Sequence, residues 1–132
     1  LRALATYTIP RIDVQVSGSL QSVAGPVVAG LFNAPAAVVA QTLGRPPSGG
    51  AANLQVNLVT PSSMYGDRMN QVDMRVGKRL RYGRTSSVLS LDVYNLLNSN
   101  AVLLESNAYA IFRRPQAVLL ARFAKVSLQF DF

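Results

Sequence analysis

The residue types that most often do chemistry in proteins are either missing from this sequence or scattered along it. The chain contains no cysteine and no histidine, so it has no thiol nucleophile, no disulfide framework and no imidazole for metal binding or proton transfer. Its six carboxylates are spread over 132 residues, a poor pattern for a metal cluster or a paired-carboxylate hydrolase. The sequence therefore predicts no catalytic residue, no metal site and no cofactor, and we expect a protein that is not an enzyme.

Arginine supplies most of the charge. The chain has eleven arginines and two lysines, and its net charge is +7. A basic balance often indicates nucleic-acid binding, but these charges lie on separate segments, and no stretch interleaves them with several aromatic residues. Arginines that line a wet pore or face anionic lipid at a membrane rim fit this distribution better. No nucleic-acid partner is expected.

Two further motifs have structural rather than chemical explanations. The stretch 44–50 reads GRPPSGG; it lacks the Lys followed by Ser or Thr of a phosphate-binding loop, and no buried strand precedes it. Asn95 and Asn98 are expected to start and cap a loop rather than to bind a ligand. The sequence assigns no ligand-binding residue.

The clearest secondary-structure signal lies at the end of the chain. From Ala124 the even positions are apolar as far as Phe132, and the odd positions from Lys125 to Asp131 are polar. This period of two predicts a strand with one apolar and one polar face, and we expect the closing strand to span 116–132. A transmembrane barrel uses both faces, because lipid contacts the apolar one and a wet lumen the polar one.

Four further segments alternate in the same way and predict an all-β fold. The expected strands are residues 1–9, 12–23, 70–82, 85–95 and 116–132. Short turns at Pro10 and Gly83 alternate with long loops at 24–69 and 95–115. Outer-membrane barrels have tight turns on the periplasmic side and long loops outside. We therefore expect an antiparallel meander of about five long strands, a partial transmembrane β-barrel with a periplasmic C-terminus.

Three finer expectations follow from the same pattern. Residues 36–43 and 53–59 are expected to pair as a small hairpin across the turn at 44–50. Arg122 falls on the apolar face of the closing strand; either its long side chain extends to the membrane interface, or the lipid boundary on this strand is not where the pattern sets it. Four aromatic residues are expected near one level, as an aromatic girdle. They are Tyr7, Tyr82, Phe130 and Phe132.

The alternation also assigns six charged side chains to the polar, lumen-facing side. These are Asp73, Arg75, Arg79, Arg81, Asp92 and Lys125. As a functional set they would line a substrate path or contact an internal plug. The alternative, which we favour, is a solvated interior with cross-strand ion pairs worth about 0.2–1 kcal/mol each.

A resemblance to a known family is carried by residues 69–100, which read MNQVDMRVGKRLRYGRTSSVLSLDVYNLLNSN. This run resembles the penultimate hairpin of TonB-dependent outer-membrane receptors, and DVYNLLNSN is similar to the family's ending of the next-to-last strand. The closing AKVSLQFDF resembles the family's terminal strand with its aromatic last residue. Residues 44–71 are similar to the subgroup of large receptors with a carboxypeptidase-regulatory-like domain at the amino end.

The resemblance implies a substrate-uptake barrel of about 22 strands with an internal plug, of which residues 1–132 are the C-terminal segment. It implies a place in the bacterial outer membrane, with lipid, the barrel-assembly machinery and the rest of the barrel and plug as partners. It also implies a C-terminal assembly signal that is read by strand pairing; the alternative is a lipid-facing strand without a recognition role. The signal residues are Val126, Leu128, Phe130 and Phe132.

Two other functions stay open from the sequence. A soluble, secreted β-sandwich that binds carbohydrate or a surface would use strands of about 3–10 residues and would cluster its aromatics on one loop or face. An anchor or adhesin barrel would differ only in parts of the protein outside this sequence. As an isolated chain in water, the expected open sheet would have two unpaired edges and would aggregate.

Overall fold

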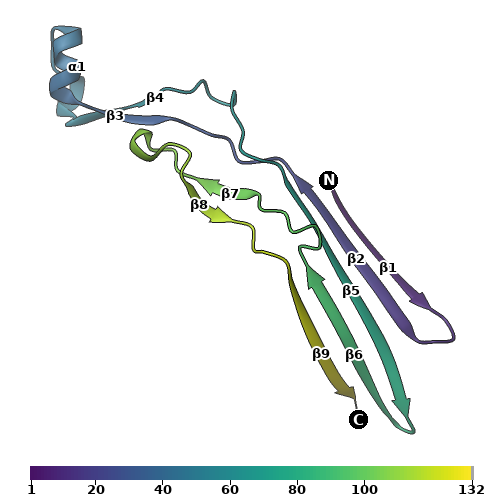
Figure 1. Ribbon diagram of the computed structural model, residues 1–132. Helices are drawn as coiled ribbons and strands as arrows, with labels where there is room; N and C mark the ends of the chain where they lie inside the picture. Colours follow the sequence, from purple (N-terminus) through teal and green to yellow (C-terminus); the bar gives the residue numbers. More distant parts are fainter. Residues whose placement is uncertain (132) are drawn as a thin grey trace. The chain divides into compact units, whose positions relative to one another are not determined.

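The structure of the protein is a computed structural model that describes residues 1–131 (Figure 1). The chain divides into two compact units. The first contains Leu1–Ala24, Arg68–Ala101 and the stretch from Val118 onward, and the second contains Gly25–Asp67 and Val102–Ala117. Phe132, one of the four predicted assembly-signal residues, lies outside the described residues.

The first unit is a five-stranded sheet in the order β1-β2-β5-β6-β9, with every neighbouring pair antiparallel. The strands are β1 (Arg2–Ile9), β2 (Val14–Val23), β5 (Met69–Tyr82), β6 (Thr85–Tyr94) and β9 (Phe123–Asp131). Each strand lies beside the one that precedes it in this set, so the predicted all-β antiparallel meander of five long strands is confirmed. Within the described residues, β1 and β9 form the two edges of the sheet.

The closing strand is shorter than the sequence predicted. Residues 116–118 belong to β8 (Pro115–Val118), which pairs with β7 (Val102–Glu105) rather than with the five-stranded sheet. The chain then leaves the extended pattern until Phe123, which faces Tyr94, the last residue of β6. The predicted start at residue 116 is wrong because β6 offers no partner beyond Tyr94.

The strands of the sheet are staggered. The long strand β5 bonds to β2 through residues 69–78 and to β6 through residues 74–82. Its ladder to β6 therefore begins five residues later and ends four residues later than its ladder to β2. The hairpin turn at 83–84 consequently lies further along the sheet than the turn at 10–13. A sheet with this stagger is the kind that strands tilted relative to a common axis require.

The second unit contains two short hairpins. Strand β3 (Leu31–Pro35) pairs with β4 (Asn53–Asn57), and β7 pairs with β8. Between β3 and β4 lie the helix α1 (Ala36–Leu43) and the single turn η1 (Ser48–Gly50), and η2 (Tyr109–Ile111) lies between β7 and β8. The Phe32 and Tyr109 rings meet edge to face, with centroids 5.5 Å apart. No helix in the described part of the chain is long and apolar enough to cross a membrane.

The expected hairpin in the first long loop has a different first strand. Residues 36–43 form α1, not a strand, and β4 pairs instead with β3, with Leu31 opposite Asn57 and Pro35 opposite Asn53. The stretch AAVVAQTL contains good helix formers. It is bracketed by Pro35 at the N-cap and by Gly44 at the C-cap, where φ is 68°. Proline at the start of a helix and glycine after its end are common boundary residues.

We predict that Gly25→Ala disrupts the second unit. A Cβ at this position would overlap the Gly66 carbonyl and lie 2.6 Å from the Asp67 carbonyl oxygen. The segment that begins at Gly25 lies against the segment that ends at Asp67. Two hydrogen bonds connect them, from Gly66 N to Pro26 O (2.8 Å) and from Val28 N to Met64 O (2.9 Å), and the substitution would disrupt both. We expect a loss of about 2 kcal/mol or more in the local opening free energy, measured by hydrogen exchange of these two amides in detergent micelles.

The control is Gly18→Ala in β2, where the nearest atom to a new Cβ is the Asp73 carbonyl oxygen at 3.8 Å. This contact is an ordinary van der Waals distance, so exchange of the Gly66 and Val28 amides should stay at the wild-type rate. Equal protection in the Gly25→Ala and Gly18→Ala proteins would contradict the close approach.

Candidate functional site

The candidate site is the pair of faces of the five-stranded sheet, because the register carries the alternation of each strand across all five. Cross-strand neighbours in an antiparallel sheet project to the same side. We call one side the apolar face; its central rows are Ala5–Gly18–Met74–Val93–Ala124 and Tyr7–Val16–Val76–Leu91–Val126. We call the other the polar face; its central rows are Thr6–Ser17–Arg75–Asp92–Lys125 and Thr8–Gln15–Gly77–Ser90–Ser127.

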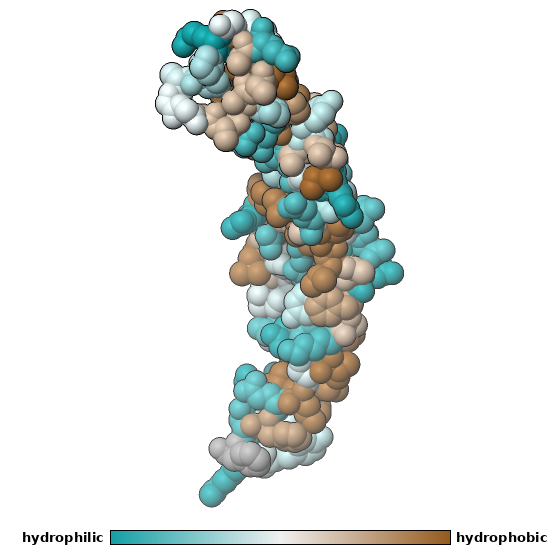
Figure 2. Space-filling model, turned by 90° about the vertical axis from the view of Figure 1, so that its left-hand side faces the viewer, coloured by the Kyte–Doolittle hydropathy of each residue, from teal (hydrophilic) through white to brown (hydrophobic). Residues whose placement is uncertain are grey.

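The apolar face is uncovered within the first unit. Val126, Leu128 and Phe130 of β9 are 71, 54 and 56% exposed, and Leu89 and Leu91 of β6 are 45 and 44% exposed. The described strands of the sheet contain no buried apolar side chain. In the lower part of Figure 2, which holds the sheet, hydrophobic side chains gather along the right-hand side. These side chains therefore have no protein core to enter.

Three side chains of the described sheet are buried: Ser87 on the apolar face, and Ser90 and Asp92 on the polar face. Ser90 and Asp92 are only 3 and 5% exposed. Arg75 satisfies both: its Nε lies 3.0 Å from Asp92 Oδ1, and its Nη2 donates a hydrogen bond of 3.3 Å to Ser90 Oγ. Water-soluble proteins usually bury apolar side chains and expose polar ones. In the described sheet, by contrast, the large apolar side chains of one face are exposed and the buried side chains are polar.

Asp73 accepts several hydrogen bonds on the polar face, near the end of the sheet from which the two long loops leave. It accepts from Gln71 Nε2 at 2.9 and 3.1 Å, from Ser19 Oγ at 3.4 Å and from the Asn95 backbone N–H at 2.9 Å. The carboxylate thus connects β2, β5 and the end of β6. Its role here is structural, since these donors come from three separate segments of the sheet.

Asn95 and Asn98 have the capping role that the sequence predicted. Both have positive φ, 50° and 51°, a conformation that Asn tolerates better than most residues. Asn95 is 2% exposed. Its Nδ2 donates to Ser99 O (2.8 Å) and Leu120 O (2.7 Å), and its Oδ1 accepts from Ser99 N (2.8 Å). Asn98 Oδ1 accepts from Arg122 N at 3.0 Å.

Arg122 does not lie on the apolar face of a strand. It precedes β9 in an irregular stretch, and its backbone N–H is occupied by Asn98. Its side-chain Nη1 donates to Leu96 O at 3.4 Å. The predicted extension of Arg122 to a membrane interface from within the strand is therefore wrong, because the loop ties this residue to the end of the preceding hairpin.

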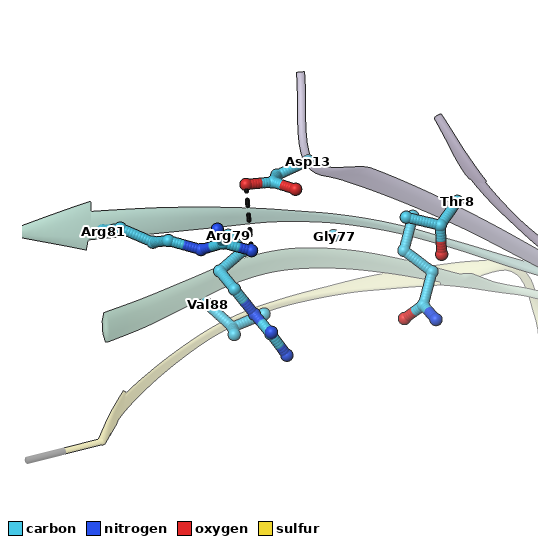
Figure 3. Close-up of a pocket in the computed structure, with 7 residues that line it drawn as sticks. Thr8, Asp13, Gly77, Arg79, Arg81 and Val88 are labelled. Atoms are coloured by element: carbon cyan, nitrogen blue, oxygen red, sulfur yellow. Dashed lines mark ion pairs between the residues drawn. The ribbon is translucent and has the colours of Figure 1, made fainter. Parts of the chain in front are cut away.

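A solvent-open hollow of about 260 Å³ lies on the polar face near the hairpin turns (Figure 3). It is lined by Thr8, Asp13, Gln15, Gly77, Arg79, Arg81 and Val88. Gly77 has no side chain, which leaves the space between its neighbours open. Arg81 Nη2 pairs with Asp13 Oδ2 at 3.3 Å, whereas Arg79 extends away from that pair and forms no ion pair within the described residues. The hollow's lining of two arginines, one aspartate and neutral polar side chains suits a small polar or anionic solute.

The structure places all six predicted lumen-facing charged residues on the polar face. It brings Arg75 and Asp92 together and places Arg79 and Arg81 at the same hollow, while Asp73 lies with Asn95 at the other end. The sequence did not predict that Asp13 pairs with Arg81. The position of Asp13 beside the first short turn was the signal from which this pair could have been predicted. In the part of the chain that the structure describes, no three acidic side chains gather to hold a metal ion.

The sequence also missed an ion pair in the second unit. Arg113 Nε and Nη2 donate to the two carboxylate oxygens of Glu105 at 2.9 and 3.3 Å. The hydrogen bond that Arg113 donates to Glu105, and then the negative charge of Glu105, raise the pKa of Arg113 above its ordinary value. Arg113 has a φ of 58°. Loop contacts of this kind follow no periodic pattern, so the residue types alone give no signal for them.

Three of the predicted assembly-signal residues lie on the described part of β9. Val126, Leu128 and Phe130 share the apolar face, and β9 is an edge strand. The predicted aromatic girdle stays a prediction. Tyr7 lies in the same cross-strand row as Val76, whereas Tyr82 lies six residues further along β5. Only a tilt of the strands would bring the two tyrosines nearer to one level.

Comparisons with protein-family models, with curated proteins and with solved structures find no match to this chain.

We predict that Asn95→Ala destabilises the junction between the sheet and the second long loop. The change removes three side-chain hydrogen bonds made by the buried Asn95 to main-chain groups of Ser99 and Leu120. We expect the free energy of unfolding in detergent micelles to fall by about 2–3 kcal/mol, measured by denaturant titration followed by circular dichroism.

Asn98→Ala is the matched control, because both residues have a φ near 50° and both lose an Asn side chain, but Asn98 accepts only one hydrogen bond, from Arg122. We expect the Asn98 variant to lose about 1 kcal/mol. Equal losses for the two variants would show that the backbone conformation, not the side-chain network of Asn95, accounts for the effect.

Proposed function

We propose that this chain is the C-terminal part of the barrel of a TonB-dependent receptor, a non-enzymatic protein that takes up a substrate across the bacterial outer membrane. The observation that carries the proposal is the inverted burial of the sheet. An apolar face without a covering layer lies opposite a polar face on which the buried Asp92 pairs with Arg75. Lipid is the solvent that favours the first face, and a wet lumen favours the second.

Energetics support lipid rather than water on the apolar face. Moving one large apolar side chain out of water contributes about 1.5–3 kcal/mol, and this face exposes many of them. A soluble β-sandwich would cover such a face with a second sheet. Within its described residues the first unit has a single sheet, so no observation favours the sandwich.

The geometry of the sheet supports a barrel segment in two further ways. Its strands are long, with 10, 14 and 10 residues in β2, β5 and β6, and a tilted strand needs about 9–11 residues to cross a bilayer. The stagger of the β5 ladders supports the proposal, because closure into a barrel requires strands whose register is staggered. The long connections β2-to-β5 and β6-to-β9 both leave from the same end of the sheet, as extracellular loops would.

The receptor family is proposed from the resemblance of residues 69–100, together with the role of one of its residues. Asn95 of the DVYNLLNSN stretch closes the end of β6 against the following loop. The uptake of a substrate, the outer-membrane location and the partners expected of such a barrel belong to this proposal. Those partners are lipid, the assembly machinery and the remaining barrel with its plug.

The membrane-facing side of the sheet can be tested with single tryptophans, because the chain contains none. Leu128→Trp and Gln129→Trp are adjacent positions of β9, both exposed, on the apolar and the polar face respectively. After the complete barrel that contains this chain is folded into phosphatidylcholine vesicles, with tryptophans outside residues 1–132 replaced by phenylalanine, we expect lipid brominated in its acyl chains to quench the Leu128→Trp protein strongly and the Gln129→Trp protein weakly. Equal quenching at both positions, or a folded monomer in buffer without lipid, would reject the proposal in favour of a soluble module.

A second test addresses the assembly signal on β9. Phe130 is 56% exposed on the apolar face of this edge strand, where strand pairing with a recognition protein would read alternate side chains. In vesicles that contain purified barrel-assembly machinery, we expect Phe130→Ser to slow folding about ten-fold. Gln129→Ser, on the opposite face, should fold at the wild-type rate.

The readout of this second test is the time course of protection from added protease. If Phe130→Ser slows folding equally in vesicles with and without the machinery, β9 is a lipid-facing strand and carries no recognition signal.

A further inference from the structure

Lys78 is the one charged residue on the apolar face of the described sheet. Its row reads Ile9–Val14–Lys78–Leu89–Leu128, so four apolar residues share its level. The side chain is exposed. The row is also the last one before the β1–β2 turn, because Ile9 ends β1 and Val14 begins β2. Lys78 therefore lies level with that turn, and the β5–β6 hairpin continues beyond it.

A cation at this place constrains where the membrane surface can lie. On the lipid face of a barrel, Lys or Arg costs several kcal/mol at the bilayer midplane but almost nothing near the interface. The long apolar stem of Lys allows its ammonium group to reach the headgroup region while the methylenes stay against apolar neighbours. Lys78 is consistent with a lipid-facing strand only if it lies at the rim, which places the headgroups at the β1–β2 turn.

A second cation lies in the β1–β2 turn that adjoins this row. Arg11 is an exposed residue of the β1–β2 turn, with a φ of 80°. Two acidic residues at this end of the sheet, Asp13 and Asp131, have other partners. Asp13 pairs with Arg81 on the polar face at 3.3 Å, and Asp131 accepts from Ser86 Oγ and Gln129 Nε2 at 3.4 and 3.1 Å. Within the described residues neither Lys78 nor Arg11 forms a salt bridge.

We propose that Lys78 and Arg11 form a site for the phosphate headgroup of an anionic phospholipid in the leaflet at the hairpin-turn end of the sheet. The inference rests on the proposed membrane-barrel function and names a ligand for it. A lipid fits better than free phosphate, because Lys78 projects from an apolar surface beside Val14 and Leu89, which would contact the acyl chain. The anionic headgroup supplies a negative charge that the described residues do not place there.

The chain provides its own control, since its two lysines lie on opposite faces of the sheet. Lys78 is on the apolar face, and Lys125 is on the polar face in the row of Arg75 and Asp92. Lys78→Gln and Lys125→Gln remove the same formal charge and the same ammonium group. Any general attraction between a basic chain and an anionic membrane changes equally in the two variants, so a difference between them reports the position of the lysine.

The experiment measures partition of the complete barrel that contains this chain, with tryptophans outside residues 1–132 replaced by phenylalanine, into vesicles of phosphatidylcholine alone and into vesicles where phosphatidylglycerol replaces part of it. All variants also carry Leu128→Trp, so insertion is followed by tryptophan fluorescence. We expect the chain with both lysines intact to prefer the vesicles that contain phosphatidylglycerol. Lys78→Gln should reduce that preference about five-fold, as one cation near an anionic surface implies, and Lys125→Gln should leave it unchanged. Added inorganic phosphate should not compete.

The outcomes separate the two proposals. Insertion into both kinds of vesicle with equal effects of the two lysine substitutions overturns the lipid site and leaves the membrane sheet intact. Competition by inorganic phosphate also overturns it, because the site then recognises a free anion. If the tryptophan introduced at position 128 enters vesicles of neither composition, the membrane proposal is overturned and the lipid site with it. Arg11→Gln gives a second measure and should act in the same direction as Lys78→Gln.

Discussion

The main-chain hydrogen-bond ladder is the interaction on which this sheet depends, because its five strands have no apolar core to hold them together. The buried apolar side chains of the described residues are Val28, Ala34 and Ala101, and none of them lies on a strand of the sheet. In water each ladder bond would compete with solvent and contribute little. In hydrocarbon the alternative to a ladder bond is an unsatisfied polar group, so the same bonds become much harder to break.

The polar face adds cross-strand contacts to that ladder, and they are concentrated where the sheet would otherwise fray. Asp73 and Asn95 tie the ends of β5 and β6 to the loop that follows, and Arg81 ties the β1–β2 turn to β5 through Asp13. Between these ends, Arg75 pairs with a buried Asp92. Both ends of the sheet are thus held by side chains that face the same side, and Lys78 is the one charged side chain on the apolar face of the described sheet.

The sequence predicts the long strands well and the connections poorly, for a physical reason. A period of two persists wherever two different environments face a strand, so β1, β2, β5 and β6 are found within one or two residues. The stretch 36–43 has no such alternation, and its helix depends on the proline and glycine at its ends. The start of β9 depends on where β6 ends, and the pairs Arg81–Asp13 and Arg113–Glu105 depend on loop paths. No local pattern encodes these.

The strand directions in this sheet limit which further strands could pair with its two edges. Because five antiparallel strands are an odd number, the two edge strands β1 and β9 run the same way. Any strand that continues the antiparallel pairing must run opposite to both of them. Copies of this sheet arranged head to tail would meet with parallel edges and could not close an antiparallel ring. A closed barrel with an even strand count therefore requires an odd number of additional strands, whose first and last members share one direction.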